Sequence, residues 1–411
     1  MPGKVAWESL QQSRLTTPRK KEFNINLLPW SPADKTPNPL SLSGAFTTLC
    51  VTATLSLATT ASAQHHYQQT NLVSDVPGMA AATDPSLVNP WGLSRSAASP
   101  WWVADNGPGL STLYNGTGVK QGLVVTIPPP LGQTDTSTPT GTVFNPSGDF
   151  QVGPAGTTLP ARFLFATEDG TISGWNPTAN PTTAITKVDW SGKAVYKGLT
   201  LGQIGSANYL YAANFFSGKV DVFDKDFNPV DLGTWAFSDP HLPKGYAPFN
   251  VQAIGSQIFV SFAKQDAEKI DEVAGPGRGY VDVFTTSGVL SMRLKWGPWF
   301  NAPWGIAWAP ADFGRFSNMI LVGQFGSGKI AAFDPANGKF KGLVHGANHW
   351  PIKIDGLWAL YFGNGASAGP TNSLYFTAGI DDEAHGLFGT LTALPDPVNM
   401  DKDNDDDGGD D

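Results

Sequence analysis

Short runs of bulky hydrophobic residues, each containing one small residue, recur along the chain and are separated by polar turns. Each run predicts a buried β-strand, because it is bounded by turn-forming residues. The six runs are Trp102–Ala104, Leu164–Ala166, Leu210–Ala212, Phe259–Ser261, Leu321–Gly323 and Tyr375–Thr377. Their small residues are spaced at intervals of 62, 46, 49, 62 and 54 residues. Self-similarity on this scale indicates a repeated structural unit.

Two further features accompany these runs. A Gly-containing turn follows each run and leads into a second strand with an aromatic residue near its end. After that strand, Asn or Asp commonly begins a turn that reverses the chain direction. A different motif precedes the run in four units, at Asn89–Leu93, Ala247–Val251, Ala302–Ile306 and Asp355–Leu360. We expect each of these motifs to open the innermost strand of a blade, where the backbones converge on an axis.

This order of elements predicts an all-β fold, a six-bladed β-propeller. Each four-stranded blade would be apolar on both faces and could bury them only against its neighbours. The last unit ends after Leu391, one strand short, whereas Tyr67–Val73 is strand-like and has no unit of its own. We therefore predict that the N-terminal strand closes the ring and covers a sheet edge that would otherwise favour aggregation. A two-sheet sandwich is the alternative fold.

Composition separates two terminal segments from the propeller, which we place at residues 64–395. Residues 1–63 are predicted to be an N-terminal extension and signal peptide, because Gly44 to Ala63 carry no charge and end in a small-x-small pattern. Cleavage after Ala63 would deliver a protein without a membrane span to the periplasm or the cell exterior, and would remove Cys50, the one cysteine. A weak membrane anchor is the alternative. Residues 396–411, with eight Asp and one Lys, are predicted to be a disordered acidic tail.

Charge narrows the class of partners. The formal net charge of the whole chain is −9, and much of it belongs to the tail, so the propeller is only mildly acidic. A basic stripe that could neutralise phosphates is missing from the sequence, and we expect no nucleic-acid partner. We expect a monomer held together by packing, since the predicted mature chain has no cysteine to form a disulfide.

Several of these motifs resemble those of a conserved hypothetical family of exported microbial proteins. The likeness extends over about residues 65–392, and its segments are Tyr67–Asp75, Asn89–Ser94, Trp101–Gly107, Ala212–Phe215 and Asn301–Gly305. The resemblance implies an exported propeller and leaves its activity open. More distantly, the blades resemble NHL-repeat propellers and the metal-dependent lactonases of the senescence-marker and gluconolactonase type. In those lactonases, Glu, Asn and Asp side chains from several blades hold a divalent cation on the axis.

Polar residues are predicted to gather at one mouth of the central channel. The loops that enter the innermost strand and leave the second strand meet there, and they carry the oxygen donors Asn89, Asp105, Asn106, Glu168, Asp169, Asn214, Asn250 and Gln324. Such donors suit a hard cation such as Ca²⁺ on the propeller axis. The alternative is that they cap turns and accept hydrogen bonds from loop amides, in which case no cofactor is evident.

Four aromatic residues occupy equivalent places in four units and predict a collar at the same mouth: Trp91, Phe249, Trp304 and Trp358. A collar of this kind could bind a ring ligand, or it could pack between the blades. Two functions remain open. One is binding of a small molecule, glycan or protein at the mouth. The other is lactonase-type hydrolysis, in which a cation polarises a carbonyl and Asp105 or Glu168 acts as base.

Overall fold

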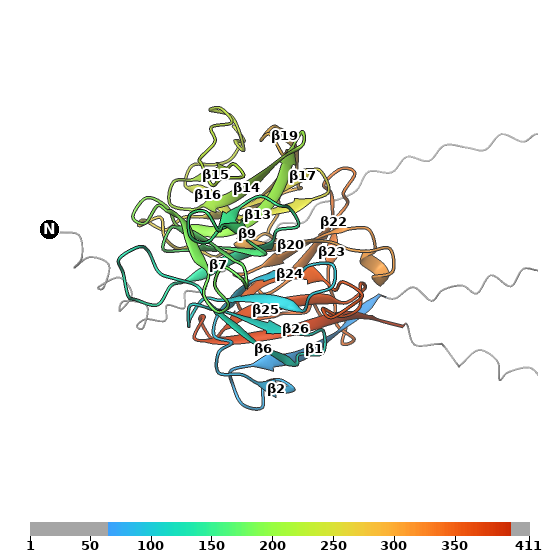
Figure 1. The fold of residues 1–411 in the computed structure, drawn as a ribbon. Helices are drawn as coiled ribbons and strands as arrows, with labels where there is room; N and C mark the ends of the chain where they lie inside the picture. Colours follow the sequence, from blue (N-terminus) through green and yellow to red (C-terminus); the bar gives the residue numbers. More distant parts are fainter. Residues whose placement is uncertain (1–64, 396–411) are drawn as a thin grey trace, which may run out of the picture. The chain divides into compact units, whose positions relative to one another are not determined.

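The computed structural model describes residues 65–395 and contains six β-sheets arranged in a ring, a six-bladed β-propeller (Figure 1). The predicted fold class is therefore confirmed. The predicted signal peptide, Cys50 and the acidic tail lie outside the described residues. Within residues 65–395, no helix has the length and apolar character needed to cross a membrane.

The first three blades follow one another along the chain. Blade 1 is formed by β3 (Pro90–Ser94), β4 (Trp101–Asp105), β5 (Leu110–Tyr114) and β6 (Lys120–Thr126). Blade 2 is formed by β7 (Pro139–Phe144), β10 (Phe163–Thr167), β11 (Thr171–Trp175) and β12 (Ile185–Asp189). Blade 3 is formed by β13 (Tyr196–Ile204), β14 (Ala207–Asn214) and β15 (Lys219–Phe223). A separate small sheet pairs β8 (Gln151–Val152) with β9 (Leu159–Pro160).

The last three blades complete the ring. Blade 4 is formed by β16 (Tyr246–Ile254), β17 (Gln257–Lys264), β18 (Tyr280–Thr285) and β19 (Leu290–Arg293). Blade 5 is formed by β20 (Pro303–Trp308), β21 (Ile320–Gln324), β22 (Ile330–Phe333) and β23 (Phe340–Leu343). Blade 6 is formed by β24 (Leu357–Phe362), β25 (Leu374–Ile380), β26 (His385–Leu394), β1 (His66–Ser74) and β2 (Ala82–Thr83).

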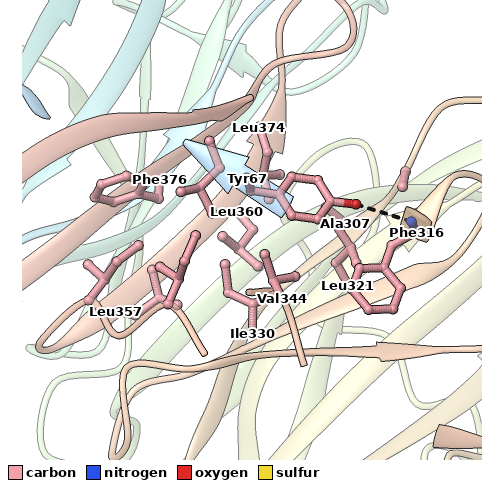
Figure 2. Packing of buried hydrophobic residues seen from close by; sticks show 14 of the residues in the cluster. Tyr67, Ala307, Phe316, Leu321, Ile330, Val344, Leu357, Leu360, Leu374 and Phe376 are labelled. Atoms are coloured by element: carbon pink, nitrogen blue, oxygen red, sulfur yellow. Dashed lines mark hydrogen bonds between the residues drawn. The ribbon is translucent and has the colours of Figure 1, made fainter. Parts of the chain in front are cut away.

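The N-terminal strand closes the ring, as the sequence predicts. Strand β1 pairs antiparallel with β26, with Thr70 opposite Thr390, so the two ends of the described chain lie in one sheet (Figure 1). Tyr67 anchors this strand, because its hydroxyl donates a hydrogen bond to the Phe313 carbonyl at 2.8 Å. The same hydroxyl accepts a hydrogen bond from the Phe316 N–H at 3.1 Å (Figure 2). Burial raises the pKa of Tyr67 to about 12, so the phenol remains a donor at physiological pH.

The innermost strand of every blade carries a register irregularity close to its start. These are strands β3, β7, β13, β16, β20 and β24, and each contacts the innermost strands of the two neighbouring blades. The extra residue of a β-bulge changes the direction in which a side chain points. The residue that follows the bulged position is glycine in four blades. In β13 this glycine is Gly198, and a Cβ on it would collide with the Asn250 side chain of the next blade. In the four blades with glycine, the neighbouring innermost strands therefore approach too closely for a larger residue at this position.

Candidate functional site

Six loops and the starts of the six innermost strands share one end of the ring. Each loop joins the second strand of a blade to the third, and we call them the mouth loops: residues 106–109, 168–170, 215–218, 265–279, 325–329 and 381–384. Because neighbouring strands are antiparallel, the end of the second strand lies beside the start of the innermost one. Side chains from blades far apart in sequence can therefore meet at this mouth.

Lys197 lies at the centre of the mouth. Its side chain is only 1% exposed, and its Nζ lies 2.5 Å from Glu168 Oε1 and 3.3 Å from Asp271 Oδ1. The ammonium also lies 5.0 Å from the centroid of the Trp91 ring and 5.9 Å from that of Phe215. Burial alone would lower the pKa of Lys197, but the neighbouring carboxylates outweigh it and raise that pKa above its ordinary value. Lys197 is therefore a fixed positive charge.

Four carboxyl groups from three blades form a cluster with this ammonium: Glu168, Asp271 and Glu272 act on it directly, and Glu383 acts on Glu272. Glu168 follows β10 in blade 2, Asp271 and Glu272 belong to the long mouth loop of blade 4, and Glu383 belongs to the mouth loop of blade 6. Glu272 is half-buried. Burial raises its pKa to about 8, a change that Lys197 opposes and Glu383 reinforces. We call Glu168, Lys197, Asp271, Glu272 and Glu383 the mouth cluster; its acidic groups outnumber its single cation.

Two asparagines connect the carboxylates across blade 1. The Asn89 Nδ2 donates to Glu383 Oε2 at 2.7 Å and to Asn106 Oδ1 at 3.3 Å. The Asn106 Nδ2 in turn donates to Glu168 Oε2 at 3.0 Å. Asn89 has a positive φ of 46°, a conformation that asparagine tolerates better than most residues. The network thus runs without a break from blade 6 through blade 1 to blade 2.

The mouth loop that carries Glu383 is strained. Asp381, Asp382 and Glu383 are three successive non-glycine residues with positive φ, at 57°, 50° and 65°. A left-handed conformation costs a non-glycine residue about 1–3 kcal/mol. Hydrogen bonds hold the turn in place, among them one from the Asp381 N–H to the Asp355 carboxylate at 3.0 Å. Strain of this kind concentrates at functional sites, and here it directs Glu383 toward Asn89.

The four predicted collar residues form a buried plug beneath Lys197. Trp91 stacks on Trp358 with ring centroids 3.5 Å apart, and Trp304 and Phe249 each lie 5.8 Å from Trp358. Each of the four residues is at most 4% exposed. Two indole N–H groups make hydrogen bonds inside the ring: Trp358 donates to Asn89 Oδ1 and Trp304 to the Lys197 carbonyl. The aromatic plug, as we call Trp91, Phe249, Trp304 and Trp358, thus packs the axis; whether it touches a ligand stays a prediction.

The structure brings together only part of the predicted donor set. Asn89, Asn106 and Glu168 meet at the mouth cluster, whereas the other five donors each bond to a backbone group, and Asn214 and Asp169 also bond to the side chains of Asp221 and Thr138. The backbone contacts are Asp105 with Thr112 N–H, Asp169 with Thr138 N–H, Asn214 with Ser217 N–H, Gln324 with Asn301 N–H and Asn250 with the Trp304 carbonyl. Burial raises the pKa of Asp105 well above its ordinary range. Among residues 65–395, no group of three or more His, Cys, Asp or Glu side chains has an arrangement that could hold a metal ion.

Sequence reasoning missed Lys197, Asp271, Glu272 and Glu383. One signal for Lys197 is present, because Lys197-Gly198-Leu199 occupies the place that Trp91-Gly92-Leu93 has in blade 1. Four blades have an aromatic at this position and blade 2 has Thr140, so Lys197 is the one charged residue of the series. The acidic residues lie in loops, where sequence spacing indicates no partner.

Two uncharacterized proteins of Acanthamoeba polyphaga mimivirus, R648 and L690, are similar to this chain. R648 is 32% identical over 330 residues, which is 78% of each chain, and L690 is 33% identical over 329 residues, or 78% of this chain and 84% of the relative. The chain belongs to the family of these viral proteins. No protein-family model matches the sequence. The predicted kinship with exported microbial proteins stays a prediction.

Solved propeller structures are more distant. The virginiamycin B lyase of Staphylococcus aureus aligns over 80% of this chain and 99% of its own, with 11% identity and a TM-score of 0.47. A protein of unknown function from Bacteroides thetaiotaomicron covers 79% of this chain and 76% of its own, with 10% identity and a TM-score of 0.49. Likeness at this level carries no inference about ligand or activity.

Proposed function

We propose that the protein binds a small, hydroxyl-bearing ligand of neutral or positive charge at the channel mouth. The mouth cluster is the observation that carries this proposal, because blades 2, 4 and 6 place four carboxyl groups in one network with the Lys197 ammonium of blade 3. Sites assembled from several blades hold polar groups in a fixed arrangement, which lowers the cost of ordering them around a ligand. An amino sugar is the simplest ligand class with these properties.

The charge of the mouth cluster favours cations and hydroxyl groups over anions. Carboxylate oxygens accept hydrogen bonds from ammonium and hydroxyl groups, and those to charged groups are the stronger kind. The Asp271 side chain is 40% exposed, so a ligand at the mouth can reach its oxygens. An anionic ligand would meet like charges, which cost binding energy. We infer that binding takes place outside the cell, in line with the predicted signal peptide.

The lactonase-type alternative requires a divalent cation on the axis. At this mouth the Lys197 ammonium already lies between Glu168 and Asp271, and so provides the positive charge that these carboxylates neutralise. Direct coordination of a divalent cation would require Glu168 and Glu383 to give up the hydrogen bonds that they accept from Lys197, Asn106 and Asn89. The residues present therefore do not fit such a cation, and we derive no catalytic step through one.

Tryptophan fluorescence of the whole protein tests the proposed binding, because Trp91 lies directly beneath Lys197. We expect glucosamine to change the emission in a saturable way, and gluconate, which is anionic, to leave it unchanged. Glu383→Gln preserves the shape of the side chain but removes its charge, and should weaken glucosamine binding about tenfold or more.

Asp334→Asn provides the matched control, because Asp334 lies in a turn after the third strand of blade 5, at the opposite end of the ring from the mouth loops. This variant should bind like the wild type. Saturable binding of gluconate in place of glucosamine, or an unchanged affinity in Glu383→Gln, would contradict the proposal.

A further inference from the structure

A second polar space lies on the axis, separate from the mouth cluster. It is a cavity of about 20 Å³ with contributions from all six innermost strands. Its lining residues include Thr142, Asn250, Gln252 and Trp304. Apart from Trp304, all of them follow the plug position of their strand by one to three residues. Because the innermost strands run away from the mouth, the cavity lies beyond the aromatic plug.

One hydroxyl in this lining lacks a partner. Thr142 is only 7% exposed, and its Oγ1 makes no hydrogen bond to another described residue. A buried polar group without a partner costs about 1–3 kcal/mol, and native structures therefore satisfy nearly all such groups with protein or ordered water. The orphaned hydroxyl points to an occupant that the cavity can accommodate.

The strands around the cavity offer additional polar groups. Each innermost strand is the terminal strand of its sheet and pairs with a neighbour on one side only. Its other edge has no strand partner, although side chains of other strands donate to some of its carbonyls, among them those of Trp91, Lys197 and Trp304. Blade-to-blade packing brings six such edges together without pairing them. A small molecule on the axis could bridge edge groups from different blades.

The volume of the cavity and the charge of its lining residues indicate which molecule it can hold. A cavity of about 20 Å³ holds about one water molecule. The lining contains no Asp, Glu, Lys, Arg or His, so an ion bound there would have no counter-charge to offset its loss of hydration. We propose that the axial cavity is a binding site for one ordered water molecule, which hydrogen-bonds to the Thr142 hydroxyl and to strand-edge backbone groups. Its role is to satisfy polar groups at the centre of the ring.

The sign of one stability change tests this proposal. Thr142→Val keeps the shape of the side chain and removes the hydroxyl. If the hydroxyl binds water, the variant loses that hydrogen bond and its melting temperature Tm should fall by about 2 °C. An unchanged or higher Tm would overturn the proposal, because removing a truly unpaired hydroxyl relieves a cost.

Ser261→Ala is the control, since Ser261 Oγ is another buried hydroxyl without a partner among the described residues and does not line the cavity. Its Tm should stay the same or rise.

Crystallography gives a readout that does not depend on stability. In crystals of the whole protein soaked in thallium(I) acetate, the cavity should contain one density peak within hydrogen-bonding distance of Thr142 Oγ1 and no anomalous signal. An anomalous peak would show a monovalent-cation site, and an absence of density would show a dry cavity; either result overturns the water site. Neither outcome bears on glucosamine binding at the mouth, which the aromatic plug separates from this cavity.

Discussion

At the scale of the residue, Lys197 organises the mouth. It is the single cation of the mouth cluster, it is almost fully buried, and it contacts carboxylates from two other blades. The sequence predicts an aromatic at the equivalent position of four other blades and makes no prediction for blade 3. The role of Lys197 becomes evident only when Glu168 and Asp271 are seen beside it.

Replacing Lys197 should therefore be costly. Lys197→Met keeps a side chain of similar volume but leaves Glu168 without its cation, and removing one partner of a buried ion pair costs about 3–5 kcal/mol. We expect the free energy of unfolding, measured by urea denaturation, to fall by about 3 kcal/mol. The double variant Lys197→Met/Glu168→Gln should recover part of this loss, and a single variant as stable as the wild type would contradict the ion-pair assignment.

The raised pKa of Glu272 predicts a pH dependence. The folded protein holds this proton up to a pH of about 8, whereas the unfolded chain releases it near the ordinary value of 4.5. The folded state therefore binds more protons between pH 4.5 and 8, and stability falls as the pH rises through this window. Glu272→Gln removes this term, so its Tm should exceed that of the wild type at pH 8 and approach it near pH 4.5.

Glu268→Gln is the matched control for this effect, because Glu268 lies in the same mouth loop and is exposed. Its Tm profile should run parallel to the wild-type profile across the pH range. A Glu272→Gln profile that also runs parallel would show that this carboxyl titrates alike in the folded and unfolded chain, which contradicts its raised pKa.

At the scale of the element, two features of the strands determine how the ring closes and how side chains are positioned at its mouth. The irregularity at the start of each innermost strand turns one side chain toward the axis, which is how Trp91, Lys197 and Trp358 meet although they belong to three blades. The closing strand β1 is the second feature. It was predictable from sequence because the last unit lacks a strand, but the anchor formed by the Tyr67 hydroxyl depends on residues about 250 positions away.

Tyr67→Phe should weaken this closure. The variant keeps the ring that packs against Phe313 but leaves the Phe313 carbonyl and the Phe316 N–H without their shared partner. We expect the free energy of unfolding to fall by about 1–3 kcal/mol. Hydrogen exchange should show the largest increase at β1 and β26, because the strand that closes the ring is held less firmly. Protection of these strands equal to the wild type would contradict a role for the hydroxyl.

At the scale of the whole molecule, the ring separates two polar centres. The mouth cluster is acidic and open to solvent through Asp271, whereas the axial cavity is uncharged and lies beyond the aromatic plug. The collar residues predicted to bind a ligand are the barrier between the two. A ligand at the mouth would therefore meet the mouth cluster before any aromatic face of the plug.

The sequence alone determined the strands, the turns, the number of blades and the closing strand, because these depend on local hydrophobic runs and on turn residues that repeat along the chain. It also placed Asn89, Asn106 and Glu168 at the mouth, since each adjoins a recognisable strand end. Only the tertiary structure decided which polar residues meet. Lys197, Asp271, Glu272 and Glu383 come from three blades, and no local pattern encodes a contact made across the axis of a ring.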